Sequence, residues 1–368
     1  MRRALLFVIL AALGCEREMA SMMEGGPMDG GRPDVPVGMP DGMMPDVGPV
    51  DAEPPDVEPD ADPNALRVNH MQVRGTNNSY HTNTNPFDLE FRDYYHLPLA
   101  EQAGEQGIRF FDFDLDPDRR AGIALDPRVS DALDVETICG PWFWCLFDFE
   151  FWLDDNPQHA LIVFFVAESY RFNTPPGLLF QLDDLEEDAV LTLGRDRILT
   201  PADVRGEHRT LREAIQQRGW PTAEQTRGKV MFVLNDHAEA RMRYIESGGL
   251  DPDDRLLFLM GDPARAEAPD TGDEVIFSFE PEFDGDPWYF ETDPGELERI
   301  RELVAAGYLV HGVSDDPEMV AELRAAGAHF IATRYPDEVF GGIPATGPIA
   351  CNPVTRPDAC DPADFEPR

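Results

Sequence analysis

The stretch Ile108-Arg109-Phe110-Phe111-Asp112-Phe113-Asp114 has the composition of a buried strand that ends in acidic residues. Residues two apart in a strand face the same way, so Asp112 and Asp114 share one face and Phe111 and Phe113 share the other. Two carboxylates that point the same way from an apolar strand repel each other and are poorly solvated, so they need a cation or a shared proton. The stretch therefore predicts a strand with a functional site at its end.

Eight stretches have this strand-like character, being short, apolar and rich in β-branched or aromatic residues. They are residues 71–74, 108–115, 161–167, 230–234, 256–260, 275–279, 308–313 and 330–333. Helical patterns lie between them, at residues 97–106, 142–153, 210–218, 238–247, 294–306 and 317–326. Eight strands that alternate with helices predict an α/β fold, a (β/α)8 TIM-type barrel. A doubly wound open sheet is the alternative, but no glycine-rich phosphate loop follows the first strand.

The first 15 residues have the features of an export signal. Arg2 and Arg3 precede an apolar run from Ala4 to Leu13, which is too short to span a bilayer, and Gly14-Cys15 follows. Small residues directly before a cysteine resemble a bacterial lipobox, so we expect Cys15 to be lipidated after cleavage. The protein would then be exported and anchored by lipid to the cell envelope, at the outer membrane or the periplasmic face. An ordinary secretory peptide is the alternative.

Residues 16–63 are dense in Pro, Asp, Gly and Met, and they contain 13 acidic and 2 basic residues. Such a segment cannot bury enough apolar surface to offset the entropy of ordering, so we expect a disordered, extended tether. The remaining residues, 64–368, are expected to form the barrel with a disulfide-containing C-terminal tail. The whole chain has a formal net charge of −41, which argues against nucleic acid as a partner and favours cations. We expect a monomer.

Four cysteines remain once Cys15 is set aside, an even number in a chain expected to be exported. Disulfides are therefore expected, and the economical pairing joins Cys139 to Cys145 and Cys351 to Cys360. A zinc site is the weaker alternative, because no histidine lies at ligand spacing from either pair.

Oxygen-bearing side chains follow the first three expected strands. Asn78 comes after the first strand, Asp112 and Asp114 end the second, and Glu168 follows the third. Barrel enzymes carry their chemistry where the strands end. Four oxygen donors without thiol or imidazole suit a hard cation, Ca²⁺ before Mg²⁺, whereas each acid alone would be a solvated strand end. Arg74, in the first strand, is expected to be a structural ion-pair partner.

Gly75-Thr76-Asn77-Asn78-Ser79-Tyr80-His81 follows the first expected strand. This block is similar to the Gly-Thr-His-Asn-Ser-Tyr-His block of bacterial calcium-dependent phosphoinositide phospholipase C-like proteins. The other matching blocks are residues 96–99 with Glu101-Gln102, 198–206, 210–214, 219–222, 227–234 and 351–353. The resemblance implies a TIM-type barrel, a calcium site, and cleavage of a phosphodiester in inositol phospholipids. Asn78, Asp112, Asp114 and Glu168 fall on the family's calcium ligands.

The resemblance also shows three departures from the family. The first catalytic histidine of the family falls on Asn77, the second falls near Val129 and Ser130, and a lysine of the family becomes Tyr170. An amide does not titrate near neutrality, so Asn77 can hydrogen-bond a phosphate oxygen but cannot transfer a proton. His237, after the fourth expected strand, is placed to replace a proton carrier, and His81 and His96 are further candidates.

Two functions remain open on these grounds. The first is a metal-dependent phosphoric diester hydrolase that acts on phospholipid with altered or lost proton-transfer chemistry. The second is a surface lipoprotein that binds a cation and a ligand without turnover. A glycerophosphodiester phosphodiesterase shares the barrel, but its blocks match less well.

Overall fold

The computed structural model describes residues 65–82, 94–116, 128–129, 137–168, 177–235, 241, 244–245, 255–265, 272–279, 294–340 and 349–367. The expected export signal, Cys15 and the tether of residues 16–63 lie outside these residues. Among the described helices, none is both long enough and apolar enough to cross a bilayer.

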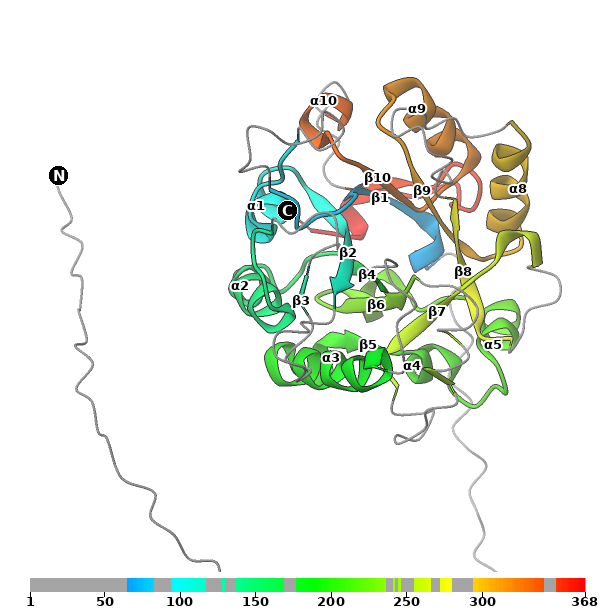
Figure 1. The fold of residues 1–368 in the computed structure, drawn as a ribbon. Coiled ribbons are helices and arrows are strands. Elements are labelled where there is room, and N and C mark those ends of the chain that lie inside the picture. Colours follow the sequence, from blue (N-terminus) through cyan, green and yellow to red (C-terminus); the bar gives the residue numbers. More distant parts are fainter. Residues whose placement is uncertain are drawn as a thin grey trace, which may run out of the picture. The chain divides into compact units, whose positions relative to one another are not determined.

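Eight parallel strands close into a barrel, which confirms the expected fold (Figure 1). In order around the barrel they are β1 (Met71–Thr76), β2 (Ile108–Asp116), β4 (Ile162–Glu168), β6 (Val230–Leu234), β7 (Leu257–Gly261), β8 (Glu274–Phe279), β9 (Leu309–Val313) and β10 (Phe330–Thr333). The pairing of β10 with β1 closes the ring. Each expected strand lies within two residues of an observed one.

Three short strands are added to this barrel. They are β3 (Arg128–Val129), antiparallel to the end of β2, β5 (Ile198–Leu199), parallel to β6, and β11 (Ile349–Cys351), antiparallel to β1. None was expected, because two or three residues are too few to show a periodic pattern.

Helices surround the barrel (Figure 1). They are α1 (Leu99–Gly104), α2 (Trp142–Asp155), α3 (Gly177–Leu193), α4 (Pro201–Arg205), α5 (Leu211–Gln217), α6 (Ala223–Thr226), α8 (Pro294–Ala305), α9 (Pro317–Ala326) and α10 (Pro336–Phe340). Five of the six expected helices are present, and the sixth, at residues 238–247, lies mostly outside the described residues. The longest helix, α3, was not expected, and neither were α4, α6 and α10.

Alternation along β2 separates the barrel interior from the layer under the helices. Phe110 points inward, and its ring centroid lies 4.6 Å from that of Phe165 and 5.6 Å from that of Phe330. Phe111 points outward and lies 5.4 Å from Phe149 of α2. The aromatic residues of β2 therefore fill two cores, and Asp112 and Asp114 fall on the inward face as predicted.

Gly75 lies within β1, although the expected strand stopped one residue before it. A Cβ atom at this position would lie 2.5 Å from Cδ1 of Phe110. Only glycine leaves room for that ring where β1 meets β2, so the strand continues through Gly75 to Thr76.

The C-terminal tail covers the end of the barrel at which the strands begin. Arg109, which is 3% exposed, donates from Nε and Nη2 to the Glu366 carboxylate at 2.8 and 2.5 Å. Glu366 also accepts from the backbone N–H of Ala160 at 2.9 Å, and Phe365 beside it is 1% exposed. A disulfide joins Cys351 to Cys360 within the tail. The tail is thus part of the core.

Four buried histidines have a pKa well below the ordinary value of the side chain. Burial lowers the pKa of each one, to about 4 in three cases and to about 3 in the fourth; they are His96, His159, His329 and His311. His96, His159 and His311 each make a hydrogen bond through one ring nitrogen, and His329 makes one through each of its two nitrogens. The folded protein therefore holds these imidazoles neutral at pH values where an unfolded chain would protonate them.

Replacing Glu366 should destabilise the fold strongly. Glu366→Ala leaves the buried Arg109 without its acid, so the free energy of unfolding should fall by about 3–5 kcal/mol. Chemical denaturation measures this change. The exposed Glu338→Ala is the matched control and should change stability by less than about 0.5 kcal/mol. Equal effects of the two substitutions would contradict the role given to the tail.

Acid should destabilise the protein in a window set by the buried histidines. Because their pKa values are lowered on folding, their contribution is complete above about pH 6.5 and is lost as the pH falls towards 4. At pH 5 each should cost on the order of 2 kcal/mol relative to pH 7 or above. Urea denaturation at pH 7, 6 and 5 tests this, and His329→Gln should make the pH dependence shallower. Constant stability over that range would contradict it.

Candidate functional site

The turn after β1 is fastened to β2 through Ser79. The backbone N–H of Ser79 donates to the carbonyl oxygen of Asp112 at 2.8 Å, and the Ser79 hydroxyl accepts from the backbone N–H of Asp112 at 2.8 Å. Regular pairing of β1 with β2 ends at Thr76 and Phe111. Ser79 thus extends the contact between the two strands by a side chain, and it brings the turn over the carboxyl end of β2.

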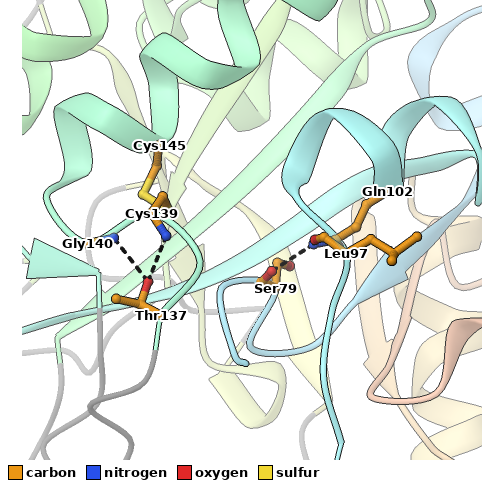
Figure 2. The surroundings of a disulfide bond; sticks show 7 residues. All are labelled: Ser79, Leu97, Gln102, Thr137, Cys139, Gly140 and Cys145. Carbon is orange, nitrogen blue, oxygen red and sulfur yellow. Dashed lines mark hydrogen bonds between the residues drawn. A yellow bond between two sulfur atoms is a disulfide. The ribbon is translucent and has the colours of Figure 1, made fainter. Parts of the chain in front are cut away.

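Gln102 of α1 supports this turn from the outer side. Its Nε2 donates to the carbonyl oxygens of Ser79 at 2.8 Å and Leu97 at 2.7 Å (Figure 2). Its Oε1 accepts from the Thr76 hydroxyl at 2.8 Å. The amide is fully buried and uses both of its ends. Sequence analysis gave Gln102 no role of its own, although it belongs to one of the blocks that carry the family resemblance.

Asn77 and Asn78 occupy the turn itself. Asn77 Nδ2 donates to Asp112 Oδ2 at 3.1 Å, and its backbone N–H donates to the Thr333 carbonyl at 3.1 Å. Asn78 has a φ of 48°, in the left-handed region that asparagine tolerates better than most residues. The two amides are therefore held at the carboxyl ends of β1, β2 and β10, where a barrel carries its chemistry.

Asp112 and Asp114 both lie at this rim, as their spacing predicted. Asp112 is 6% exposed, whereas Asp114 is half-buried. Asp114 Oδ2 accepts a hydrogen bond from the hydroxyl of Tyr80 at 2.8 Å. The segment after β1 thus contacts both carboxylates of β2, one through Asn77 and one through Tyr80.

Two predicted positions can be placed only in part, and three others not at all. Glu168 ends β4 in register with Leu115 of β2, so its backbone is at the same rim, but its side chain lies outside the described part of the chain. Val129 of β3 is paired with Leu115 of β2, the residue after Asp114, and its side chain lies outside the described part of the chain as well. His237, Ser130 and Tyr170 lie outside the described residues.

A disulfide holds the loop that packs on the turn. Cys139 is bonded to Cys145 at the start of α2, the pairing expected from the sequence. The Thr137 hydroxyl accepts from the backbone N–H groups of Cys139 and Gly140, both at 3.3 Å (Figure 2). The next residue, Ile138, donates its N–H to the Tyr80 carbonyl at 2.9 Å. The disulfide therefore stiffens the segment against which Tyr80 is held.

The two histidines nearest the turn are buried. His96 is 3% exposed and His81 is fully buried. Burial lowers the pKa of His96 to about 4, so the ring is neutral at physiological pH and Nε2–H donates to the Asn77 carbonyl at 2.9 Å. His96 thus holds the backbone of Asn77. Neither ring is exposed to take a proton from a bound ligand, although both were candidates on sequence grounds.

A cationic and aromatic cluster lies beside Asn78. Arg334, which follows β10, donates from its backbone N–H and from Nε to the Asp315 carboxylate at 2.8 and 2.6 Å. Its guanidinium carbon lies 5.6 Å from the ring centroid of Tyr94, whose hydroxyl accepts from Asn78 Nδ2 at 3.4 Å. Sequence analysis missed this cluster; the signal was an arginine and an acid directly after two expected strands.

The donor chemistry at the rim fits a hard cation. Asn78, Asp112 and Asp114 offer amide and carboxylate oxygens, which Ca²⁺ prefers. Among the described residues, no three His, Cys, Asp or Glu side chains are grouped closely enough to hold a metal. A calcium site here therefore depends on the Asn78 amide and on Glu168, whose side chain is not described.

Comparisons with known proteins assign the chain to a class and then to a family. The closed barrel is that of the phospholipase C-like TIM barrels. The model of the family described as "Phosphoinositide phospholipase C, Ca2+-dependent" matches residues 128–340, more than half of the sequence, and the chain belongs to this family. The match includes Glu168 and begins after Asn77, Asn78, Asp112 and Asp114. No curated protein sequence matches the chain.

Solved structures show the same fold. A calcium-dependent phosphoinositol-specific phospholipase C from Pseudomonas sp. superposes with a TM-score of 0.57 at 14% identity, over 78% of this chain and 96% of that one. A Ca²⁺-dependent phosphatidylinositol-specific phospholipase C from Streptomyces antibioticus has a TM-score of 0.51 at 18% identity, over 75% and 98%. At these identities the likeness establishes the barrel alone.

Calcium should stabilise the folded protein through the acid pair. A calcium concentration one hundred times the dissociation constant should add about 2.7 kcal/mol, seen as a rise in melting temperature. Asp112→Asn with Asp114→Asn should abolish that rise. Asp148→Asn with Asp155→Asn removes the same charge from the exposed side of α2 and should preserve it. A rise that survives the first pair of substitutions would place calcium elsewhere.

Proposed function

We propose that the protein binds the phosphodiester headgroup of an inositol phospholipid, with calcium, at the carboxyl-end rim of its barrel. In this proposal it is a phospholipase C-type phosphodiesterase with altered proton-transfer chemistry. Family membership and the oxygen donors at the rim support the substrate and the cation. The observation that carries the proposal is Asn77, which stands where the family has a catalytic histidine and is hydrogen-bonded to Asp112 at 3.1 Å.

Each rim residue has a role in this proposal. Asn78, Asp112, Asp114 and Glu168 would hold the calcium ion. When bound, calcium supplies positive charge against the phosphate oxygens. Asn77 would donate a hydrogen bond from its amide to a phosphate oxygen, and His96 and Ser79 keep the turn in place for it.

Proton transfer is the step for which the proposed site is least well equipped. Attack by a sugar hydroxyl on phosphorus needs one group to take a proton and another to protonate the leaving alcohol. Each transfer is worth about 10²–10⁴ in rate. With an amide at Asn77 and valine at position 129, turnover should be slower than in a relative with both histidines by up to the product of the two factors. His237 is proposed as a partial replacement.

The second candidate function is ligand binding without turnover. The burial of His81 and His96 favours it, because neither ring is exposed at the rim where a ligand would bind. Both functions use the same calcium and headgroup contacts. They differ in whether a phosphorus–oxygen bond is broken.

The first residues of the chain are the basis for proposing that the protein is attached to a membrane. A lipidated Cys15 with an acidic linker of 48 residues, 16–63, would keep the barrel near a membrane surface. Exclusion of nucleic acid follows from the charge of −41.

Hydrolysis separates the two candidates. Purified protein is incubated with phosphatidylinositol vesicles and calcium, and released inositol phosphates are measured by chromatography. Slow release that stops with a chelator and with Glu168→Ala is expected. Glu187→Ala, an exposed glutamate of α3, is the matched control and should leave the rate unchanged. Binding to the vesicles without any release, even at high protein concentration, would establish the second function.

Restoring the family's histidines should raise the rate. Asn77→His together with Val129→His is expected to increase release by at least about 10²-fold, because a general base or acid returns to the rim. Asn77→Gln is the control, since it changes size without adding a titratable group. No gain from the double substitution would show that these two positions do not face the reacting phosphate.

A further inference from the structure

Arg74 points away from the candidate site. In β1, Gln72 Nε2 donates to the carbonyl oxygen of Arg324 at the end of α9 at 2.9 Å, and Thr76 donates to Gln102 of α1 at 2.8 Å. Arg74 lies between Gln72 and Thr76 at the same parity, so its side chain also enters the layer between barrel and helices. This layer lies on the opposite side of the strand from Asn77.

Arg74 and Arg324 share one aromatic ring. The guanidinium carbon of Arg74 lies 5.6 Å from the ring centroid of Phe340, and that of Arg324 lies 5.9 Å from it. Phe340 ends α10, which packs against β1 and α9 (Figure 1). The ring is 2% exposed, whereas both arginines are half-buried. Two cations are thus held beside a fixed aromatic surface with part of each side chain open to solvent.

Neither arginine has an acidic partner among the residues that the structure describes. Arg324 Nε is buried and makes no hydrogen bond there. Asp337, in the first turn of α10, accepts from Gln106 at 2.9 Å and not from an arginine. This corrects the expectation that Arg74 is an ion-pair partner. The chain has 71 acidic and 30 basic residues, so most arginines would be expected to have a carboxylate nearby. Two neighbouring arginines without one, among the described residues, are therefore unusual in this protein.

The electrostatics of the pair are unfavourable as they stand. Burial lowers the pKa of both side chains, and the charge of Arg74 lowers that of Arg324 further. Such shifts mean that each positive charge is desolvated without compensation. Cation–π contact with Phe340 offsets part of this cost but leaves the mutual repulsion.

We propose that Arg74 and Arg324 form a binding site for a phosphate group on the outer side of the barrel, between β1, α9 and α10. Two guanidinium groups suit a phosphate dianion, because each can donate two parallel hydrogen bonds and together they match its charge. The ring of Phe340 keeps both groups in position. The site is separate from the rim of Asn77 and Asp112, and it does not depend on the proposed function.

The test uses the full chain with inorganic phosphate as the probe and a chelator present, so that calcium takes no part. At constant ionic strength, tens of millimolar phosphate should raise the melting temperature by about 2 °C over chloride. Arg74→Gln with Arg324→Gln should abolish this rise. Arg197→Gln removes a surface arginine that is paired with Asp154, and it should preserve the rise. Without phosphate the double variant should melt no lower than the parent, since the repulsion is gone.

Three results would overturn the proposal. They are no phosphate-specific rise in the parent, a rise that survives in the double variant, and an equal rise with acetate that the double variant loses, which would assign the pair to carboxylates. If the double variant fails to fold, Arg324→Lys replaces it. Lysine keeps the charge but lacks the planar fork, so phosphate affinity should fall several-fold. Unchanged affinity in that variant would equally contradict the proposal.

Discussion

The contact between Ser79 and the backbone of Asp112 is the constraint on which the rim depends. Two neighbouring barrel strands are normally joined only as far as their last backbone hydrogen bond. Here the hydroxyl and the backbone N–H of Ser79 add two hydrogen bonds between the turn after β1 and Asp112 of β2. Gln102 of α1 donates a hydrogen bond to the carbonyl oxygen of Ser79 and so holds the turn in place from its outer side. The positions of Asn77 and Asn78 follow from this junction, because both residues are enclosed between Thr76 and Ser79. A rigid turn on a rigid barrel holds ligands at small entropic cost.

The sequence predicted the barrel well because parallel strands buried on both faces are continuous apolar runs, and all eight were recognisable. The helix α3, the longest of those that were not predicted, shows the limit of prediction from local pattern. Its buried residues Leu182, Leu185, Ala189 and Leu193 follow a helical spacing, but acidic residues at 183–184 and 186–188 interrupt the pattern. One of them, Glu186, is itself buried against Arg255 at 3.0 Å, so a residue that looked like surface belongs to the interior. Whether such an acidic residue is buried depends on a partner that is distant in sequence, and the periodicity of one segment does not show that partner.

The candidate site was predictable where it follows strand alternation and was not where it depends on long-range contact. Asp112 and Asp114 share a face because they are two apart in a strand. The expected ion pair of Arg74 was wrong, because the distance of its side chain from acidic groups is set by the packing of α9 and α10. The cluster of Tyr94, Asp315 and Arg334 joins three separate segments, and no local pattern announces it. A charge of −41 adds to the difficulty, because acids are so frequent that each one alone carries little information.

The salt bridge between Arg109 and Glu366 has a consequence for how the chain is made and handled. Glu366 follows all eight barrel strands in the sequence, so the guanidinium of Arg109 in β2 has its counter-charge only after those strands have been synthesised. A chain shortened to end before Glu366 would keep every barrel strand and would leave the positive charge of Arg109 in the interior without this acid.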